Sequence, residues 1–522
     1  MEKIKLIGRG SGLSLLQIEI VKQKINALFP GIHTEVMVSN SRGDALQNIP
    51  LHTMEGTDFF TKEISEAIQS GKADIAVHSL KDMSGEHFFG SNTFAVIDRD
   101  DTRDVAIFNN YIEQKIKSGN TITVGTCSPR REEMAAGFLK KALPQLCGEI
   151  NIEIKPIRGN VETRLEKLSR GEYDGTLLAT AGLNRLLRSE KEAVRVKSLL
   201  AGKKMMLLPL TECVPAPCQG AIVAEAHPSN KKATAILEKI NNKNLFADCV
   251  AEKKEALKYG AGCMQKFGVT TLTTKHERYL YAAGKDAEGA ELTRWTPIPD
   301  VVTNNLFSST QVMKDFFRYE PIETKADINS SAVFVANYKA VQYGSTDLLQ
   351  LNGPSQGTID SSSAGDKQKI IIVSGTKTWF ELARQGYWVT ASADALGYEF
   401  LLPSLQMPLL NIKGDDICII THESAAERWR KKGYEAIGTY RLVPAHNQSV
   451  IYSITAADSI FWSSYSQFEF YGKYARPHAK HMCSGGETAE LLKQAGIEPI
   501  LFPTIKAFEQ WRKFSIRSHS AA

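Results

Sequence analysis

The sequence predicts an α/β protein of several domains, in which strands alternate with helices. The chain has 522 residues, more than one hydrophobic core usually holds, so roughly three to five domains are expected. In the first half, short β-prone runs end in polar or glycine-containing turns, and helix-length segments follow them. This β-α-β alternation is typical of doubly wound, largely parallel sheets, which bind ligands at the C-terminal edge of their strands.

A first lobe is expected over residues 1–100. Its central stretch, residues 73–83, begins as a short apolar run that predicts a buried strand. That strand delivers Lys81 and Asp82 to the sheet edge, just after a histidine and a serine. A carboxylate held beside a lysine there is a candidate catalytic group, although a salt-bridged loop would show the same pattern. The other elements expected are strands at 4–9 and 35–38 and helices at 13–28 and 62–70.

A second lobe is expected over residues 101–218, and residues 219–242 are expected to return to the first. The return begins at Gln219-Gly220-Ala221, which introduces a strand. A chain that crosses to a second lobe and comes back forms a hinged pair of the kind found in periplasmic binding proteins. The strands predicted in the second lobe, each followed by a segment that contains arginine, are 121–125, 150–154 and 173–179.

A smaller α+β domain is expected over residues 243–310, and a second α/β region over 326–522. The smaller domain begins with a helix at 244–259 that leads to Gly260-Ala261-Gly262-Cys263. Residues 301–325 predict one helix and a connection. The Ser- and Gly-rich segment 353–366 predicts a flexible loop. The other strands expected are 269–273, 279–282, 333–336, 369–373, 416–421 and 459–462.

Composition excludes several classes of protein. No run of eighteen apolar residues exists to span a membrane, and the first residues lack the apolar core of a signal peptide. The 8 cysteines include no C-x-x-C pair, which argues against a disulfide framework or a structural zinc site and suits a reducing cytoplasm. The net charge of +5 is too small to indicate nucleic acid by itself. We therefore expect a cytoplasmic protein without a metal, a nucleic-acid partner or a membrane partner.

Local positive charge in the first half points to an anionic ligand. Arginine binds carboxylates with a planar fork and keeps its charge, so several arginines around one cleft would suit a substrate with many carboxylates or phosphates. For any single arginine, a solvated surface position explains the pattern equally well. Single-stranded nucleic acid and nucleotides are disfavoured, because interleaved aromatic residues and a glycine-rich phosphate loop are missing. The arginines are Arg9, Arg130, Arg131, Arg158, Arg164 and Arg185.

Two further residues carry candidate chemistry. Asp82 amid so much positive charge would stay ionised, so it would stabilise a cationic intermediate or handle a proton on a ring nitrogen. Cys263 lies in a Gly-x-Gly-Cys turn, where glycines allow a bulky group to approach. It is a candidate nucleophile or covalent anchor, and an inert buried thiol is the alternative.

As a set, these motifs resemble the hydroxymethylbilane synthase family, also called porphobilinogen deaminases, over about residues 1–300. The matching motifs occur in the order of the family. They are Gly8-Arg9-Gly10-Ser11, Ser41-Arg42-Gly43-Asp44, residues 73–82, 125–131 and 157–165, Gly171-Glu172-Tyr173-Asp174, Ala181-Gly182-Leu183-Asn184-Arg185, Gln219-Gly220-Ala221 and residues 260–263.

The resemblance implies a dipyrromethane cofactor attached through a thioether to Cys263. It implies that four porphobilinogen units are joined with loss of ammonia and released as a linear tetrapyrrole, with Asp82 and Lys81 as catalytic residues. Asp82 would assist deamination and stabilise an azafulvenium-type cation. The residues that match the family's cofactor and substrate contacts are Arg9, Ser11, Asp44, Lys81, Ser128, Arg130, Arg131, Arg158, Arg164, Arg185 and Gln219.

The chain departs from the family pattern at a few positions. Glu55-Gly56-Thr57-Asp58 stands where the family has a glycine-lysine-glycine lid. Met83-Ser84 replaces the usual Val-Pro, and Cys127-Ser128-Pro129 replaces a Ser-Ser-Leu type. These departures bear on lid behaviour and rate more than on the reaction.

The last third resembles, less strongly, the uroporphyrinogen-III synthase family, which cyclises the linear tetrapyrrole while inverting its last ring. The resemblance implies that Tyr440 is an acid that assists loss of the terminal hydroxyl, although a packing tyrosine at a strand end would fit the same position. The matching motifs are residues 333–341, Gly375-Thr376-Lys377-Thr378, Gly438-Thr439-Tyr440-Arg441, Phe461-Trp462-Ser463-Ser464 and residues 485–489.

Three functions stay open from the sequence. The first is a fused, monomeric two-step enzyme of tetrapyrrole (porphyrin and heme) biosynthesis, a transferase and a lyase in one chain, acting on porphobilinogen and the linear tetrapyrrole. Fusion would favour capture of a product that otherwise cyclises spontaneously to the wrong isomer. The second is a deaminase whose C-terminal region is structural or regulatory. The third is a two-lobed protein that binds a polyanion without catalysis.

Overall fold

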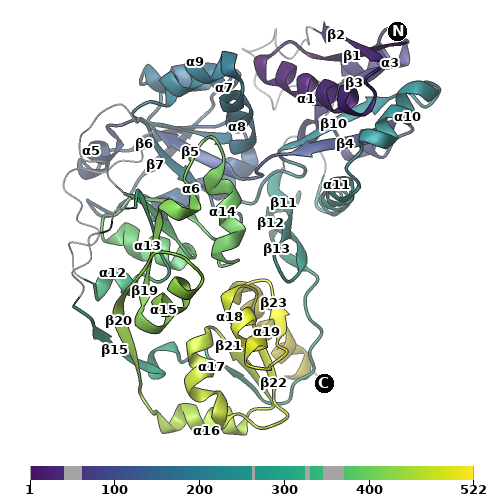
Figure 1. Ribbon diagram of the computed structural model, residues 1–522. Helices are drawn as coiled ribbons and strands as arrows, with labels where there is room; N and C mark the ends of the chain where they lie inside the picture. Colours follow the sequence, from purple (N-terminus) through teal and green to yellow (C-terminus); the bar gives the residue numbers. More distant parts are fainter. Residues whose placement is uncertain are drawn as a thin grey trace.

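The computed structural model describes residues 2–39, 62–260, 265–323, 328, 330–344 and 369–520. In this part of the chain, helices cover sheets that are mostly parallel, and the predicted α/β class is confirmed (Figure 1). Four predicted features lie outside the described residues: the motif at residues 41–44, the lid position at 55–58, the predicted cofactor attachment at Cys263 and the predicted loop at 353–366. None of the described helices has the length and apolar character needed to cross a membrane.

The first lobe contains β1 (Glu2–Arg9), α1 (Gly12–Leu28), β2 (Ile32–Ser39), α3 (Lys62–Gln69), β3 (Ile75–Ser79), the 3-10 turn η2 (Leu80–Asp82), α4 (Gly85–Phe88), β4 (Thr93–Arg99), β10 (Ala221–Ala226) and α10 (Lys231–Ile240). Its sheet has the order β2-β1-β3-β10-β4. The first three strands are parallel, and β10 is antiparallel to β3 and β4. The strand predicted to return to this sheet after Gly220 is therefore β10.

The second lobe contains β5 (Asp104–Phe108), α5 (Ile112–Lys117), β6 (Ile122–Gly125), α6 (Pro129–Ala142), β7 (Ile152–Lys155), α7 (Val161–Ser169), β8 (Gly175–Ala179), α8 (Thr180–Arg188), α9 (Glu190–Leu200) and β9 (Lys204–Leu207). Its sheet has the order β7-β6-β8-β5-β9. As in the first lobe, three parallel strands are followed by one strand that is antiparallel to both of its neighbours. The two lobes therefore share one topology.

Two chain segments connect the lobes, and they lie side by side. The first crossing, residues 100–103, joins β4 to β5, and the second crossing, residues 208–220, joins β9 to β10. The Asp100 amide donates to the Gly220 carbonyl oxygen at 3.2 Å. Gly220 has φ +83°, and a Cβ atom there would lie 2.5 Å from the Asp100 carbonyl oxygen. Only glycine allows the two crossings to approach this closely.

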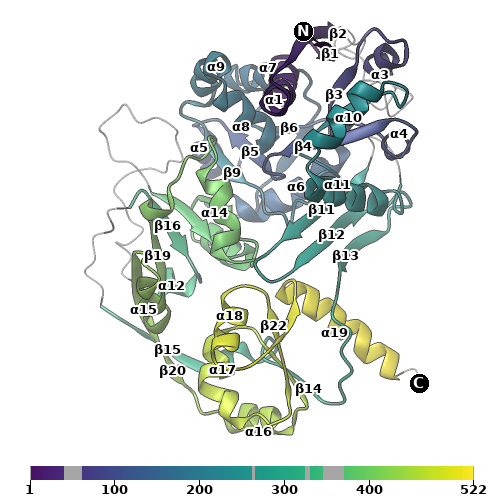
Figure 2. The ribbon, with the colours of Figure 1, turned by 45° about the vertical axis from the view of Figure 1, so that its right-hand side comes forward.

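A third unit consists of α11 (Lys243–Ala256), β11 (Lys266–Thr273), β12 (Arg278–Lys285) and β13 (Glu291–Thr296). The three strands form an antiparallel sheet. Helix α11 ends three residues before the predicted end at residue 259, and turns lead from it to Gly260. Figure 2 shows α11 lying between the first lobe and this sheet.

The C-terminal region has two sheets. The larger has the order β15-β20-β19-β16-β17-β18, and the smaller has the order β14-β21-β22-β23. Elements of the larger sheet and its helices are β15 (Phe317–Pro321), β16 (Ala332–Val335), α12 (Lys339–Gln342), β17 (Ile370–Val373), α13 (Thr376–Arg384), β18 (Val389–Ser392), α14 (Tyr398–Gln406), β19 (Ile417–His422), α15 (Glu423–Lys431) and β20 (Ala436–Pro444). Those of the smaller are β14 (Leu306–Ser308), α16 (Gln448–Ala456), β21 (Ser459–Trp462), α17 (Tyr465–Tyr471), β22 (Lys480–Ser484), α18 (Glu487–Gln494), β23 (Ile500–Phe502) and α19 (Ile505–Ser520).

The prediction of one helix within residues 301–325 is wrong for the described part of that segment. It contains two strands, β14 and β15, with only a 3-10 turn between them. Each strand pairs with a partner more than a hundred residues away, β14 with β21 and β15 with β20. A local sequence pattern cannot reveal such distant partners, and pairing outweighs local preference here. Because β14 belongs to the smaller sheet, the C-terminal region begins before the predicted boundary at residue 310.

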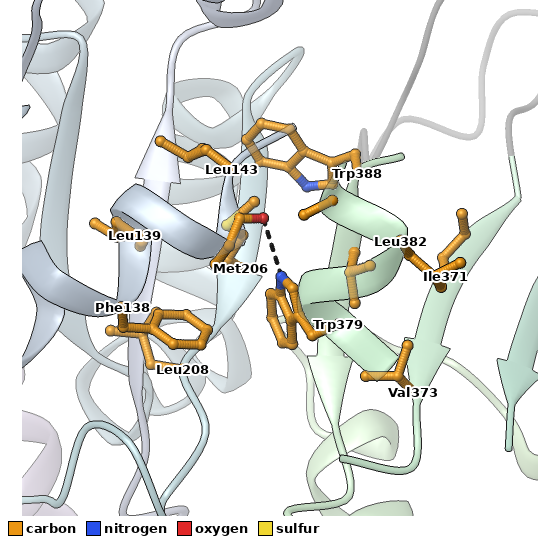
Figure 3. Packing of buried hydrophobic residues seen from close by; sticks show 14 of the residues in the cluster. Phe138, Leu139, Leu143, Met206, Leu208, Ile371, Val373, Trp379, Leu382 and Trp388 are labelled. Carbon is orange, nitrogen blue, oxygen red and sulfur yellow. Dashed lines mark hydrogen bonds between the residues drawn. The ribbon is translucent and has the colours of Figure 1, made fainter. Parts of the chain in front are cut away.

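The larger C-terminal sheet and the second lobe share one hydrophobic core (Figure 3). The Trp379 ring on α13 contacts the Phe138 ring of α6 edge-on, with centroids 5.2 Å apart. Its Nε1 donates to the Ala142 carbonyl oxygen at 3.0 Å. Trp388 packs edge-on against Phe108 in the same way, at 5.7 Å. The larger C-terminal sheet is therefore packed onto the second lobe.

Candidate functional site

The predicted catalytic pair lies at the end of β3, in the 3-10 turn η2. Residues Ile75 to Val77 of the strand are fully buried, which fixes the point at which the chain leaves the sheet. Asp82 and Lys81 are half-buried. Among the described residues, no side chain forms an ion pair with the Asp82 carboxylate. The Asp82 carboxylate can therefore contact a ligand without breaking an ion pair that the described residues form.

Across the lobe boundary, Asp104 holds two of the predicted arginines. Its Oδ2 accepts from Arg130 Nη2 and its Oδ1 from Arg131 Nη2, both at 2.7 Å. Asp104 is fully buried and both arginines are more than nine-tenths buried. Burial alone would raise the pKa of Asp104, but the two guanidinium groups outweigh it and hold that pKa far below its usual range. Asp104 therefore stays ionised and fixes both guanidinium groups.

Lys81 connects this pair with the end of β3. Burial lowers the pKa of the Lys81 ammonium group, Asp82 and Asp104 oppose that shift, and Arg130 and Arg131 reinforce it. These electrostatic interactions mean that Lys81 and Asp82 of the first lobe lie close to the Asp104 cluster of the second lobe. The structure therefore brings together four of the residues predicted for the site.

A second group of arginines lies at the start of α7. Arg164 Nε donates to the Gly159 carbonyl oxygen at 2.9 Å. Burial lowers the pKa of Arg164 to about 10, with the positive charges of Arg131 and Arg158 acting in the same direction. No carboxylate in the described part of the chain forms an ion pair with Arg164. An anionic ligand would relieve this crowding of positive charge.

Other predicted contacts already have partners within the fold, which differs from the expectation of six arginines facing one cleft. Arg185 Nη2 donates to the Gly220 carbonyl oxygen at 2.6 Å and pairs with Asp98 at 3.3 Å. The Gln219 amide nitrogen donates to the Thr102 carbonyl oxygen at 2.6 Å and to Asp104 Oδ1 at 2.9 Å. These side chains hold the crossings and the Asp104 cluster in place. Even so, the Nε atoms of Arg131 and Arg185 are buried donors without a hydrogen-bond partner.

Three predicted contacts lie where strands end or helices begin. Arg9 is the last residue of β1. The Ser11 hydroxyl caps α1 by accepting from the Ser14 amide at 3.3 Å, and the Ser128 hydroxyl caps α6 by accepting from the Arg131 amide at 3.4 Å. At both helix N-termini, the neighbouring backbone amides and the helix dipole favour negative charge.

Helix α11, which precedes Cys263 in the chain, lies next to the turn that carries Asp82. Lys253 Nζ on α11 donates to the Met83 carbonyl oxygen, one residue after Asp82. A Cβ atom at Gly85 would lie 3.0 Å from Leu257 Cδ2. The side-chain amide nitrogen of Gln265 donates to the Gly260 carbonyl oxygen at 3.2 Å, so the described residues before and after Cys263 lie next to each other. Helix α11 thus links the turn that carries Asp82 to the segment that contains Cys263.

Sequence reasoning missed the carboxylates that hold this arrangement. Glu252 on α11 binds both terminal nitrogens of Arg99 at 2.8 and 2.9 Å and accepts from the Cys218 and Thr271 amides, each at 2.7 Å. It therefore ties α11 to β4, to the second crossing and to β11. The sequence signal of Asp104 is a lone acidic residue in an otherwise apolar strand. Glu252 has no such signal, because α11 also contains Asp248 and Glu255.

The predicted acid of the C-terminal region, Tyr440, is buried on β20 of the larger sheet. Its ring centroid is 5.9 Å from those of Tyr319, Tyr343 and His422. Burial raises the pKa of Tyr440, so the phenol keeps its proton at neutral pH. Burial lowers the pKa of His422 to about 4, aided by Arg428. The His422 Nε2 atom lies 3.5 Å from the Ser466 hydroxyl of α17, which belongs to the smaller sheet.

Comparisons with known proteins place the first half of the chain. The family model described as porphobilinogen deaminase, dipyromethane cofactor binding domain, matches residues 4–235. A porphobilinogen deaminase of Chromobacterium violaceum is 35% identical over 269 residues, which cover 51% of this chain and 79% of that protein. A probable porphobilinogen deaminase of Pyrobaculum islandicum is 33% identical over 290 residues, which cover 55% of this chain and 89% of that protein. The chain belongs to the porphobilinogen deaminase family.

Proposed function

We propose that the two lobes and the third unit together form a hydroxymethylbilane synthase, which joins four porphobilinogen molecules with release of ammonia. One observation carries the proposal for the site. The half-buried Asp82 carboxylate, beside Lys81, has no ion-pair partner among the described residues and lies near the Asp104 cluster of the other lobe. A partly buried carboxylate that forms no ion pair with the described residues is suited to stabilising positive charge that develops on a substrate.

The described residues fit the dipyrromethane cofactor of the family. Each of its rings carries an acetate and a propionate, so the group needs several cationic donors. Arg131 and Arg185 each present a buried Nε without a partner, and Arg164 lacks a described carboxylate. We propose that these arginines, with Lys81, hold the cofactor carboxylates and that Cys263 forms the thioether. When bound, the cofactor supplies the pyrrole carbon to which the first substrate unit is joined.

The protein side chains then have distinct roles. Asp82 stabilises the charge that appears on the substrate pyrrole as its amino group leaves, and it orients the pyrrole N–H groups by accepting from them. Lys81 and the arginines bind the substrate's acetate and propionate groups. The remaining predicted contacts, Arg9, Ser11, Asp44, Ser128, Arg130, Arg158 and Gln219, belong to the same proposal, as binding or positioning groups.

We retain as proposals the division into four units, 1–100 with 219–242, 101–218, 243–310 and 326–522, and the monomeric state. The shared topology of the first two sheets supports the division into two lobes. The position of β14 argues for moving the third boundary toward residue 305.

Turnover and intact mass of the full-length protein test the deaminase proposal together. Asp82→Asn should keep the added mass of the dipyrrole but lose most of its turnover of porphobilinogen. Glu86→Gln, which changes an exposed carboxylate four residues away, is the matched control and should keep both. Cys263→Ser should lack the added mass. Near-normal turnover by Asp82→Asn would reject its role, and a wild-type protein that binds porphobilinogen without added mass or turnover would favour simple polyanion binding.

A second function, cyclisation to uroporphyrinogen III by the C-terminal region, is favoured by the path of the chain. The chain enters the smaller sheet with β14 and leaves through β15 to build the larger sheet. It then returns through β20, which is antiparallel to β15, to complete the smaller sheet. Tyr440, on the returning strand, and Ser466, in the smaller unit, both lie next to His422. A buried phenol that keeps its proton at this boundary is a suitable acid for loss of the terminal hydroxyl.

The isomer of the product decides between the two-step enzyme and the deaminase alone. Wild-type protein supplied only with porphobilinogen should form uroporphyrinogen III, and Tyr440→Phe should shift the product toward isomer I. Tyr434→Phe, which removes a hydroxyl from a partly buried ring outside the Tyr440 group, is the control and should leave the isomer ratio unchanged. Isomer I alone from the wild type would reject cyclisation and leave a structural or regulatory C-terminal region.

A further inference from the structure

One carboxylate of the C-terminal region contacts both crossings between the deaminase lobes. Asp394 follows β18 and is almost fully buried, with φ +57°, a conformation that aspartate tolerates better than most residues. Its Oδ1 accepts from the Thr211 amide at 3.1 Å and from the Thr211 hydroxyl at 3.0 Å. Its Oδ2 accepts from Arg103 Nη2 at 3.4 Å. Thr211 lies in the second crossing and Arg103 in the first.

The Arg103 side chain is held mainly by the C-terminal region. Its guanidinium carbon lies 5.4 Å from the centre of the Phe400 ring on α14, and its Nη1 donates to the Ser404 hydroxyl of the same helix at 2.7 Å. Asp394 provides one of its two described carboxylate partners, and Asp101 provides the other at 3.4 Å. Arg103 is 4% exposed, so these partners take the place of water around its guanidinium group.

The position of Arg103 bears directly on the candidate site, because Asp104 is the next residue. The Arg103 carbonyl oxygen accepts from the Thr180 hydroxyl at 2.6 Å, which fixes the backbone immediately before β5. The Asp104 carboxylate then orients Arg130 and Arg131. A shift of the first crossing would therefore move both guanidinium groups with it.

The C-terminal region makes a second contact with the same part of the second lobe. The Leu409 amide donates to Asn184 Oδ1 at 3.1 Å, and the Asn184 amide nitrogen donates to Asp100 Oδ1 at 2.8 Å. Arg188, one turn further along α8, binds Asp100 and also contacts the Met407 sulfur at 2.9 Å. Helix α8, which carries Arg185, and the start of the first crossing are thus tied to the C-terminal region as well.

These contacts constrain the hinge of the deaminase. Opening or closing two lobes requires the connecting segments to change their backbone angles. Here both crossings are bound to one carboxylate on a body that is itself packed onto the second lobe through a shared core (Figure 3). We therefore expect the larger C-terminal sheet and the second lobe to move together. Asp394 joins the two crossings, because it binds one residue of each.

We propose that Asp394 is a positioning residue of the deaminase, through which the C-terminal region fixes the two crossings and, through Arg103, the Asp104 cluster. The proposal rests on the proposed hydroxymethylbilane synthase function. It assigns the C-terminal region a role in the first reaction, whether or not that region cyclises the product.

The experiment compares Asp394→Asn with Trp379→Phe in the full-length protein. The asparagine keeps the size of the side chain and its tolerance of the left-handed conformation but removes the charge that faces Arg103. Trp379→Phe removes the hydrogen bond to the Ala142 carbonyl oxygen in the same interface without touching Arg103 or Thr211. The measurements are kcat and KM for porphobilinogen well below Tm, Tm itself, and hydrogen exchange of peptides that cover residues 100–104 and 208–220.

Asp394→Asn should lower kcat/KM by about 10- to 100-fold, the range expected when reacting groups are misplaced by a distant change. It should also speed exchange in both crossings. Trp379→Phe should lower Tm but keep the wild-type kinetics and exchange in the crossings. Equal kinetic loss in both variants, or wild-type kinetics and exchange in Asp394→Asn, would overturn the proposal.

Two further outcomes are covered. If Asp394→Asn folds poorly, Thr211→Val removes a single donor to the same carboxylate and should give a smaller change of the same kind, and wild-type behaviour of Thr211→Val would count against the proposal. An inactive wild type would mean that the proposed function fails. Exchange in the crossings would still decide whether Asp394 holds them, because that measurement needs no turnover.

Discussion

Replacing Asp104 by asparagine tests whether one buried carboxylate holds the second lobe and the arginine pair together. The carboxylate accepts two hydrogen bonds of 2.7 Å from guanidinium groups and one of 2.9 Å from Gln219. Asparagine keeps the shape but leaves Arg130 and Arg131, 4% and 8% exposed, without their counter-charge. Breaking a buried ion pair by removing one partner costs about 3–5 kcal/mol. Because two guanidinium groups lose the same partner, we expect a value near the upper end.

Hydrogen exchange, measured by mass spectrometry on peptides from β5 and α6, reports the loss of stability in these two elements. A loss of about 4 kcal/mol corresponds to exchange faster by roughly three powers of ten, at about 1.4 kcal/mol per tenfold change. Glu166→Gln removes an ion pair to the exposed Arg195 in the same lobe and should leave this exchange unchanged. Exchange in β5 of Asp104→Asn within a factor of about two of the wild type would refute the reasoning, since the pair would then contribute almost nothing.

The same carboxylate predicts the direction of a pH effect. The pKa of Asp104 is lower in the folded protein than in the unfolded chain, because Arg130 and Arg131 outweigh its burial. Its contribution to stability is therefore complete above the unfolded value of about 4 and is lost as the pH falls below it. Exchange in β5 of the wild type should rise as the pH is lowered through this range, after correction for intrinsic rates. Asp104→Asn should show a much smaller rise.

Three other changes have defined outcomes. Glu252→Gln should destabilise α11 by about 3 kcal/mol or more, because Arg99 loses a buried bidentate partner, and exchange in α11 peptides measures this. The pKa of Glu225 is lowered by hydrogen bonds from two histidines that outweigh its burial, so its stabilising contribution is present above about pH 4.3 and is lost as the pH falls below that value. Glu225→Gln should therefore flatten the fall of Tm below about pH 4.3. Trp379→Ala should cost about 3–5 kcal/mol and expose the shared core, which limited proteolysis between the second lobe and the C-terminal region would detect.

Local patterns in the sequence predicted the parts of the site that depend on neighbours along the chain. The apolar run before Lys81 and Asp82 is the buried strand β3, and the segment before Arg130 is β6, which ends at Gly125. Both follow from hydrophobic runs of strand length that end in polar or cap-forming residues. The same reasoning found β10 as the strand that returns to the first sheet.

The residues that sequence reasoning missed have partners far away along the chain. Asp104 binds arginines 26 and 27 residues away, Glu252 binds Arg99 across 153 residues, and Asp394 binds Arg103 across 291. Nothing local distinguishes such a carboxylate from a solvated one. For the arginines, the sequence predicted too many free donors. Their positions after strands indicate that they gather at one site, but not that Arg130, Arg131 and Arg185 already donate to carboxylates within the fold.

The shared core changes how fusion of two activities would work. A second site on a flexible linker captures a released product through an effective concentration that the linker length sets. Here Trp379 and Trp388 pack against the second lobe, and both indole N–H groups donate to its backbone. Trp379 donates to the Ala142 carbonyl oxygen (Figure 3), and Trp388 donates to the Met205 carbonyl oxygen. The distance between the sites is then fixed by packing, so lengthening the connection between the third unit and β14 should not change product capture. Loosening the Trp379 interface should change it, because that interface helps to fix how the larger C-terminal sheet faces the second lobe.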